Sequence, residues 1–249
     1  MKDLWGDIEQ RAIEVIKAHT PAEGMYVAFS GGKDSIVVLD LVRRSGVKHD
    51  AWYNLTTIDP PELVHFIKRE YPDVGWNRPK RTMWKLMETY GLPTRIGRFC
   101  CKKLKERGGD GRVVATGIRT AESPARGKRR QFEACRAGKG KWFLHPIKDW
   151  TDDDVWNYIK RHNLPYCRLY DEGWKRIGCV ICPFDRDTRR SRERWPKYWA
   201  AAKRAAKKFY DRKPRSCSFE TFWCNWLRRD GKLFTDETPE DERGTGLFV

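Results

Sequence analysis

Six residues between two apolar runs constrain the fold of this chain more than any other stretch. Ser30-Gly31-Gly32-Lys33-Asp34-Ser35 directly follows the apolar run at 25–29 and directly precedes the apolar run at 36–42. The first run predicts a buried strand, and the second predicts the opening of a helix. Two glycines let the backbone turn tightly and approach a ligand closely. Because amides at a helix N-terminus bind anions, the stretch predicts a phosphate cradle, to which the serines add hydroxyls and the lysine adds charge.

The same six residues resemble a known nucleotide-binding loop. They lack the Gly-x-x-x-x-Gly-Lys spacing of a Walker loop. They are similar to the PP-loop of the ATP pyrophosphatase superfamily, whose pattern is Ser-Gly-Gly-x-Asp-Ser. Those enzymes cleave ATP between its α and β phosphates, pass AMP to an acceptor oxygen and release pyrophosphate. The resemblance implies binding of Mg²⁺–ATP by Ser30, Gly31, Gly32, Lys33, Asp34 and Ser35; an ordinary polar turn with a solvated lysine is the alternative.

Composition indicates a cytoplasmic, polyanion-binding protein. No apolar run of the 249 residues approaches the ~18–20 needed to cross a bilayer, and the N-terminus lacks the apolar core of a secretion signal. The 51 Lys and Arg against 34 Asp and Glu give a net charge of +17, accompanied by twelve tryptophans. Such a chain suits nucleic acid, because cations neutralise phosphates and aromatic rings stack on bases. Small anionic substrates with tryptophans in the core are the alternative.

Strand and helix patterns alternate along the first three quarters of the chain. A helix over 3–19 precedes predicted strands at 25–29, 50–55, 74–76 and 112–117, with helices at 36–42, 59–71, 82–90 and 152–162 between or after them. This alternation predicts an α/β fold with a doubly wound, mostly parallel sheet that binds ligands at the carboxyl ends of its strands. Gly117 then shares that edge with the six-residue loop.

Two further regions are distinguished by their basic residues. Residues 118–141 combine cations and glycines and predict a mobile loop. A helix over 196–210 places its aromatic residues and alanines on one side and its lysines on the other. We therefore expect an α/β domain over 1–185, followed at 186–249 by a basic helical extension with an acidic tail.

Four of the eight cysteines have the spacing of a metal site. Cys100 and Cys101 are adjacent, and Cys179 and Cys182 form a Cys-x-x-Cys pair. Cytoplasmic cysteines are rarely in disulfides, and four thiolates complete either a zinc site or an iron–sulfur cluster. The residues alone leave zinc and iron–sulfur equally open.

A second resemblance covers residues 25–185. The tandem cysteines, Gly117-Ile118-Arg119-Thr120, His145-Pro146-Ile147-Lys148-Asp149-Trp150-Thr151 and Ile177-Gly178-Cys179-Val180-Ile181-Cys182 together are similar to the phosphoadenosine phosphosulfate (PAPS) reductase family. The resemblance implies an adenine nucleotide alpha-hydrolase-like, Rossmann-like fold. It also implies a [4Fe–4S] cluster held by Cys100, Cys101, Cys179 and Cys182, as in adenosine phosphosulfate (APS) reductases, and leaves Cys135, Cys167, Cys217 and Cys224 as ordinary thiols.

Two departures from that family favour ATP cleavage over reduction. Sulfonucleotide reductases use a cysteine in a Glu-Cys-Gly-Leu-His segment, which is absent from this sequence, and their PP-loop is usually eroded, whereas this one is intact. We therefore expect an ATP pyrophosphatase with Lys33, Asp34, Arg119 and Arg126 as catalytic residues. Asp34 orients the loop or helps to bind magnesium, and the two arginines suit phosphate oxygens.

The acceptor is expected to be nucleic acid, with sulfur replacing the adenylated oxygen. Relatives with an intact loop include the ATP pyrophosphatases of DNA phosphorothioation, so the DNA backbone is the preferred acceptor. A cysteine desulfurase or another sulfur donor protein is the implied partner, no membrane is involved, and a homo-oligomer is compatible with the sequence. The alternatives are an APS or PAPS reductase that uses Cys217 or Cys224, a tRNA-thiolating enzyme, the ATP-cleaving subunit of sulfate adenylyltransferase, and a non-enzymatic iron–sulfur protein.

Overall fold

The computed structural model describes residues 4–135, 140–185 and 187–229 and divides into two compact units. Unit 1 comprises Met1–Leu55, Pro61–Arg78 and Arg107–Ile177, and unit 2 comprises Thr56–Pro60, Pro79–Glu106 and Gly178–Val249. This division differs from the predicted boundary at 185/186. Three segments of the predicted α/β domain, 56–60, 79–106 and 178–185, belong instead to the unit of the C-terminal helices, because burial partners and not chain order define a unit.

The described residues of unit 1 form a six-stranded sheet in the order β3-β2-β1-β4-β6-β5. Every neighbouring pair is parallel except β5 with β6. The register aligns Met25 with His49 and Tyr26 with Val114. The strands are β1 (Met25–Phe29), β2 (His49–Asn54), β3 (Gly75–Asn77), β4 (Val113–Ala115), β5 (Phe132–Ala134) and β6 (Trp142–Leu144). The predicted α/β fold with a mostly parallel sheet is confirmed.

Strand order locates the ligand-binding edge of this sheet. From β1 the chain moves outward to β2 and β3, and it then returns to place β4 on the other side of β1. The direction of winding thus reverses between β1 and β4, and parallel sheets bind ligands beyond the carboxyl ends of the strands at such a reversal. The loop after Phe29 and the segment after Ala115 both start at that point.

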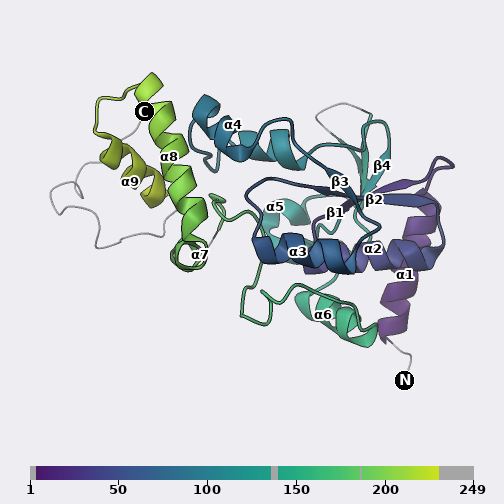
Figure 1. Ribbon diagram of the computed structural model, residues 1–249. Coiled ribbons are helices and arrows are strands. Elements are labelled where there is room, and N and C mark those ends of the chain that lie inside the picture. The colour runs from purple at the N-terminus through teal and green to yellow at the C-terminus, as the bar shows by residue number, and fades with distance from the viewer. Residues whose placement is uncertain (1–3, 136–139, 186, 230–249) are drawn as a thin grey trace. The chain divides into compact units, whose positions relative to one another are not determined.

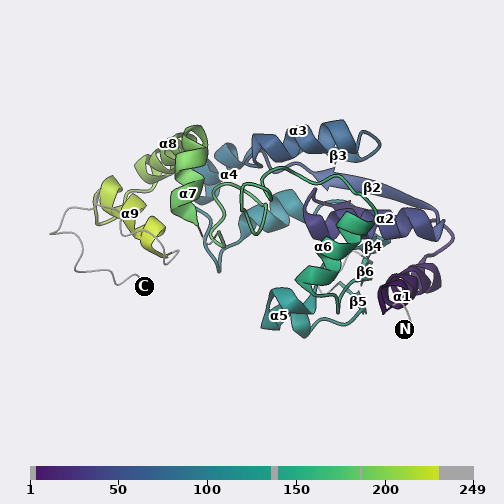
Figure 2. The same cartoon turned by 90° about the horizontal axis from the view of Figure 1, so that it is seen from below.

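Helices α1 and α6 pack against the central helix α2 (Figure 2). Helix α2 is apolar on most of its circumference because neighbours cover it on several sides. Gly46, in the left-handed conformation, ends it. Helix α6 begins at a capping box in which Thr151 and Asp154 satisfy each other's amides. The helices of unit 1 are α1 (Leu4–His19), α2 (Lys33–Ser45), α3 (Pro61–Glu70), α5 (Pro124–Gly127) and α6 (Asp152–Arg161), with a 3₁₀ turn η2 (Thr120–Glu122).

Unit 2 is helical within the described residues. Helix α8 lies against α4, α7 and α9 (Figure 1). Its predicted apolar face is buried through Trp199, Ala202, Ala206 and Phe209, which confirms the amphipathic pattern. Gly91 permits the close approach of Phe209, since a Cβ there would lie 2.9 Å from the ring. The elements are α4 (Met83–Tyr90), the π-helical turn η1 (Cys101–Lys105), α7 (Thr188–Arg194), α8 (Pro196–Arg212) and α9 (Phe219–Arg229).

The predicted loop at 118–141 is wrong in part. It contains η2, α5 and the edge strand β5, whose Phe132 stacks on Trp142 with ring centroids 5.0 Å apart. A three-residue edge strand is too short to show an alternating pattern, so no periodic signal marks it. Residues 136–139 and the acidic tail from Thr235 lie outside the described residues. No helix among the described residues has both the length and the apolar composition to span a bilayer.

Candidate functional site

The loop Ser30–Ser35, which resembles a PP-loop and is given that name below, connects β1 to α2 in unit 1, at the predicted strand-to-helix turn. Gly31 has a positive φ of 70°, and a Cβ there would lie 2.7 Å from Ile67 and 2.8 Å from Leu63. A side chain at this position would therefore be disfavoured by both the backbone and the space available. Gly32, the residue before α2, leaves the first turn of the helix without a side-chain cap. The two glycines thus let the backbone itself form the floor of the loop.

The two serines of the loop bond to each other. The Ser30 amide donates to Ser35 Oγ at 3.1 Å, the two hydroxyl oxygens lie 3.0 Å apart, and Ser35 Oγ donates to the Gly32 carbonyl at 2.8 Å. Ser35 is buried. These hydrogen bonds within the loop fix its curvature, so Ser30 and Ser35 stabilise the conformation of the loop.

Lys33 and Arg119 meet two carboxylates at the start of α2. The buried Lys33 Nζ donates to Asp152 Oδ1 at 2.9 Å and to Asp34 Oδ1 at 3.1 Å. Arg119 Nε donates to the same Asp34 oxygen at 2.6 Å, and its Nη2 donates to Asp152. Hydrogen bonds from Lys33 and Arg119 lower the pKa of Asp152. Two positive and two negative charges thus balance beside the loop.

The remaining predicted residues of this edge surround that cluster. Arg119 is 2% exposed, and its Nη1 also donates to the Trp150 carbonyl at 3.1 Å. A Cβ on Gly117 would lie 2.9 Å from Asp34, so only glycine allows β4 to end this close to α2. Arg126 is paired with Glu122. The structure therefore gathers Arg119 and Gly117 at the PP-loop and holds Asp34 as an acceptor for both cations.

Sequence reasoning missed three residues here. Asp152 belongs to a helix start and to the run that resembles the family, but neither pattern gave it a role at the loop. Tyr170 accepts a hydrogen bond from the Lys33 amide at 3.0 Å, although 137 positions separate the two. Burial, followed by the charge of the exposed Arg176, lowers the pKa of Arg126, so these two cations lie near each other. No local sequence pattern predicts these contacts, because they join segments that only the fold brings together.

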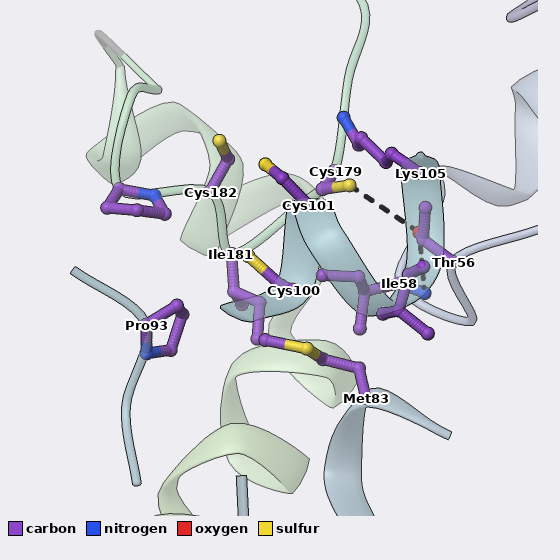
Figure 3. A pocket seen from close by; sticks show the side chains of 12 residues that line it. Thr56, Ile58, Met83, Pro93, Cys100, Cys101, Lys105, Cys179, Ile181 and Cys182 are labelled. Atoms are coloured by element: carbon purple, nitrogen blue, oxygen red, sulfur yellow. Dashed lines mark hydrogen bonds between the residues drawn. The ribbon is translucent and has the colours of Figure 1, made fainter. Parts of the chain in front are cut away.

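The four predicted metal-ligating cysteines lie together in unit 2. Cys100 and Cys101 open η1, and Cys179 and Cys182 lie in a turn closed by a bond of 3.3 Å from the Cys182 amide to the Cys179 carbonyl. All four line one cavity, with apolar walls that include Ile58 (Figure 3). The Val180 amide donates to the Ile58 carbonyl at 2.9 Å and so anchors the Cys-x-x-Cys turn.

Positive charge accompanies these thiols. A hydrogen bond from Cys100, aided by Lys105, lowers the pKa of Cys101 to about 6. The same bond raises the pKa of Cys100, and burial raises that of Cys179. Lys105 is drawn beside Cys179 in Figure 3, and the Cys179 charge raises the pKa of Lys105. A thiolate at this site is therefore stabilised by a cation from the same turn.

Cysteine is the residue type that thiolate-binding metal centres use. Four sulfurs from two segments face one cavity, which suits soft metals such as zinc or iron in a cluster. Within the described residues, no three His, Cys, Asp or Glu side chains already have the geometry to hold an ion. No disulfide joins any of the eight cysteines, all of which lie within the described residues. The ligand assignment stays a prediction.

Comparison with known proteins identifies the family. The model of the phosphoadenosine phosphosulfate reductase domain matches residues 24–185. An adenosine 5'-phosphosulfate reductase of Halalkalibacterium halodurans is 31% identical over 189 residues, which cover 69% of this chain and 80% of that enzyme. An uncharacterized protein of Methanocaldococcus jannaschii is 31% identical over 188 residues, 70% of this chain, but the chain spans only 39% of that protein's length.

A solved structure shows the same fold. The phosphate complex of PAPS reductase from Candida auris superimposes with a TM-score of 0.51 over 72% of this chain and 95% of that one, at 19% sequence identity. The matched region of the family model contains both the PP-loop and the four clustered cysteines. The chain belongs to the phosphoadenosine phosphosulfate reductase domain family.

Proposed function

We propose that this protein is an ATP pyrophosphatase that adenylates an acceptor for sulfur incorporation. The single observation that carries the proposal is the complete PP-loop between β1 and α2, with its lysine buried at the first residue of the helix. Family members named as reductases act on nucleotides that are already adenylated. A complete loop, in contrast, suits a substrate that still carries its pyrophosphate.

The proposed reaction is transfer of AMP. An acceptor oxygen attacks Pα of Mg²⁺–ATP, the bond from Pα to the bridging oxygen of the β phosphate breaks, and pyrophosphate leaves with the bond electrons. Lys33 has the position to neutralise charge that builds up on the leaving group, once phosphate oxygens replace Asp152 as its partner. Asp34 and Arg119 hold Lys33 and the loop in place. A thiol reductant releases sulfide from the persulfide of a donor protein, such as a cysteine desulfurase. The sulfide then bonds to the acceptor atom, and AMP leaves with the former acceptor oxygen.

Cys100, Cys101, Cys179 and Cys182 are proposed to hold a [4Fe–4S] cluster. Their donor set fits it, and the cationic Lys105 beside them offsets the negative charge that thiolates bring. When bound, such a cluster ties the two cysteine segments together and supplies iron that holds sulfur. The protein residues themselves provide the cavity and its positive charge.

The preferred acceptor is the DNA backbone. The net charge of +17 favours binding to a polyanion. Contacts to backbone phosphates do not depend on the base sequence. The test is release of pyrophosphate from Mg²⁺–ATP, with and without double-stranded DNA, single-stranded DNA or tRNA. Release that DNA stimulates supports the proposal, whereas stimulation by tRNA alone moves the acceptor to RNA.

An APS reductase is the second candidate. The specific observation in its favour is the 31% identity with a protein of that name, together with the four cysteines that share one cavity. Cys217 and Cys224 are the thiols that the sequence offers for that chemistry, and both are partly exposed. Release of sulfite from APS or PAPS in the presence of a thiol, without pyrophosphate release from ATP, would establish this alternative.

A further inference from the structure

The PP-loop has a partner from a distant part of the chain. The Lys33 amide, at the start of α2, donates to the hydroxyl oxygen of Tyr170 at 3.0 Å. Gly32 precedes this helix and has no side chain to cap it. The tyrosine therefore satisfies one of the amides that a helix start leaves free. Such amides are the groups that bind anions in loops of this kind.

The hydroxyl of Tyr170 still has a proton to give. A phenol carries one proton and two lone pairs, and the bond from Lys33 uses a lone pair only. In the part of the chain that the structure describes, Tyr170 Oη donates to no acceptor. A donor whose oxygen already accepts a hydrogen bond is polarised and donates more strongly. The Lys33 amide is therefore occupied by the Tyr170 oxygen, and the Tyr170 O–H takes its place as the hydrogen-bond donor at this point of the loop.

That hydroxyl borders the position that a Cβ on Gly32 would occupy. A Cβ built on Gly32 would lie 3.4 Å from Ser30 Oγ and 3.6 Å from Tyr170 Oη, which is ordinary van der Waals contact. The glycine therefore leaves room for about one heavy atom, flanked by two hydroxyl oxygens. The floor of this space is the loop backbone, and the buried Lys33 belongs to the same turn.

The position of Tyr170 is fixed by its own segment. Its ring lies edge-on to Trp156, with centroids 5.0 Å apart. Its neighbours Cys167 and Leu169 are buried, and the Tyr170 amide donates to the Cys167 carbonyl at 3.0 Å. The Gly173 amide donates back to the Tyr170 carbonyl at 2.9 Å. Because the segment is already ordered, binding through this hydroxyl needs little further ordering.

We propose that Tyr170 is a ligand of the pyrophosphate end of the bound nucleotide. Its O–H donates to a phosphate oxygen seated over Gly32, between Tyr170 and Ser30, and its oxygen continues to accept from the Lys33 amide. The inference rests on the proposed function, which it makes more specific. The opposite role is a plug, in which Tyr170 occupies the loop and has to leave before an anion binds. The two roles predict effects of opposite sign.

The test is calorimetric binding of inorganic pyrophosphate and, separately, of AMP to the full chain and its variants. Tyr170→Phe keeps the ring and its contact with Trp156 but removes the hydroxyl. We expect its Kd for pyrophosphate to rise about tenfold or more, as for a lost hydrogen bond to a charged group, and its Kd for AMP to stay unchanged. Tyr166→Phe is the matched control, because Tyr166 lies on the same segment and its hydroxyl donates to Asp171 at 3.0 Å.

A second variant tests the place of the anion. Gly32 has an ordinary φ of −80°, so Gly32→Ala fills the space without backbone strain, and we expect it to fold normally and to lose pyrophosphate binding. Unchanged or tighter pyrophosphate binding by Tyr170→Phe overturns the inference, as does normal binding by Gly32→Ala. If the unaltered protein binds neither pyrophosphate nor ATP, the proposed function fails as well. If the unaltered protein binds pyrophosphate and ATP, and Tyr170→Phe binds pyrophosphate as well as Tyr166→Phe does, only this inference fails and the proposed function stands.

Discussion

Lys33 is already bonded to two carboxylates before it meets a phosphate. A buried ammonium without partners is costly, so Asp34 and Asp152 make its burial possible. Only Asp152, whose side chain is 69% exposed, is free to turn toward solvent when a phosphate takes its place. Arg119 donates to both carboxylates, but the Asp34 side chain is only 22% exposed and therefore stays beside the lysine. Lys33 therefore has one exchangeable partner, Asp152, and one fixed partner, Asp34.

Replacing Lys33 tests the leaving-group role. We expect Lys33→Ala to slow pyrophosphate release from Mg²⁺–ATP by about 100-fold or more, the scale of losing one charged donor at a reacting centre. The visible spectrum of the cysteine site should not change, since that site lies in the other unit. Lys203→Ala is the control, because its amine pairs with Glu220 at 3.0 Å on the helical unit. A Lys33 variant with nearly full activity would contradict the role.

Asp152 also makes stability depend on pH. Its pKa is lowered in the folded protein by hydrogen bonds from Lys33 and Arg119, so its charge stabilises the fold above its ordinary pKa of 3.8. That stabilisation is lost as the pH falls through the lower, folded value. We expect Asp152→Asn to reduce the free energy of unfolding at pH 7 by at most about 1 kcal/mol, since the side chain is exposed. The difference from the unaltered protein should shrink below about pH 4.

Urea denaturation at pH 7, 5 and 3 measures this difference. Asp153→Asn is the matched control, because Asp153 is exposed in the same first turn of α6 and shares any helix-dipole effect. A difference for Asp152→Asn that grows as the pH falls would refute the assignment of that charge.

At the scale of elements, the turn from β1 to α2 depends on one glycine. Gly31 and Gly46 have nearly equal positive φ values of 70° and 72°, one at each end of α2. A Cβ at Gly31 would collide with Ile67 and Leu63, whereas a Cβ at Gly46 would meet nothing within 4 Å. Both substitutions to alanine therefore carry the same backbone penalty, and only one adds a steric penalty.

This pair separates conformational strain from packing. We expect Gly46→Ala to lower the free energy of unfolding by about 1 kcal/mol, and Gly31→Ala to lower it by about 1–3 kcal/mol more, the usual range for overpacking. Thermal or urea unfolding of the two variants gives both numbers. Equal losses would mean that Ile67 and Leu63 move aside freely.

The cysteine segments make a second prediction at this scale. Replacing Cys100, Cys101, Cys179 or Cys182 by serine, one at a time, should abolish the broad visible absorbance and the bound iron and sulfide, because each is proposed as a cluster ligand. Cys217→Ser is the control, since Cys217 lies outside the cavity that the four share. Iron analysis with absorbance spectra measures the loss. If the purified protein is colourless and contains zinc, the cluster assignment is wrong and the four cysteines form the zinc site that their spacing also allows.

Elements with strong local signals were predictable, and those without them were not. Apolar runs indicate β1 and α2, and Thr151 with Asp154 marks the start of α6. Strands β5 and β6 were both missed, because neighbouring charged residues and glycines predicted a loop there, and the two strands become ordered by pairing with each other and with β4. The assignment of 79–106 to unit 2 was missed because only packing on α8 reveals it. In the site, motif residues were predictable, whereas Tyr170 is placed by a turn whose buried neighbours do not resemble a motif.

Over the whole molecule, the net charge of +17 suggests a larger cationic surface for a polyanion than the unpaired side chains provide. Many basic side chains in the two basic regions, 118–141 and 196–210, are already paired. In the basic loop Arg126 and Arg129 meet glutamates, and on α8 Lys207 and Lys208 meet Asp211 and Glu88. A paired cation keeps its own carboxylate close and contributes less to attraction at long range. The sum of charges alone therefore overstates the binding surface.

Helix α8 allows this point to be tested within one element. Lys197 and Arg204 are exposed on α8 and form no ion pair with any described residue, whereas Lys207 pairs with Asp211 at 2.5 Å and Lys208 with Glu88 at 3.1 Å. If α8 contacts DNA through its free cations, replacing Lys197 and Arg204 together by alanine should reduce the slope of log K against log salt concentration by about 1.8, or about 0.9 for each phosphate that is no longer neutralised.

The double variant of Lys207 and Lys208 is the matched control, and its slope should change by less than half as much. Fluorescence anisotropy with random-sequence DNA at several salt concentrations measures both slopes. Equal reductions would show that the ion pairs on α8 open when DNA binds, because both pairs of cations would then release counterions alike. An unchanged slope in both variants would remove α8 from the interface and leave the excess positive charge to other surfaces of the molecule.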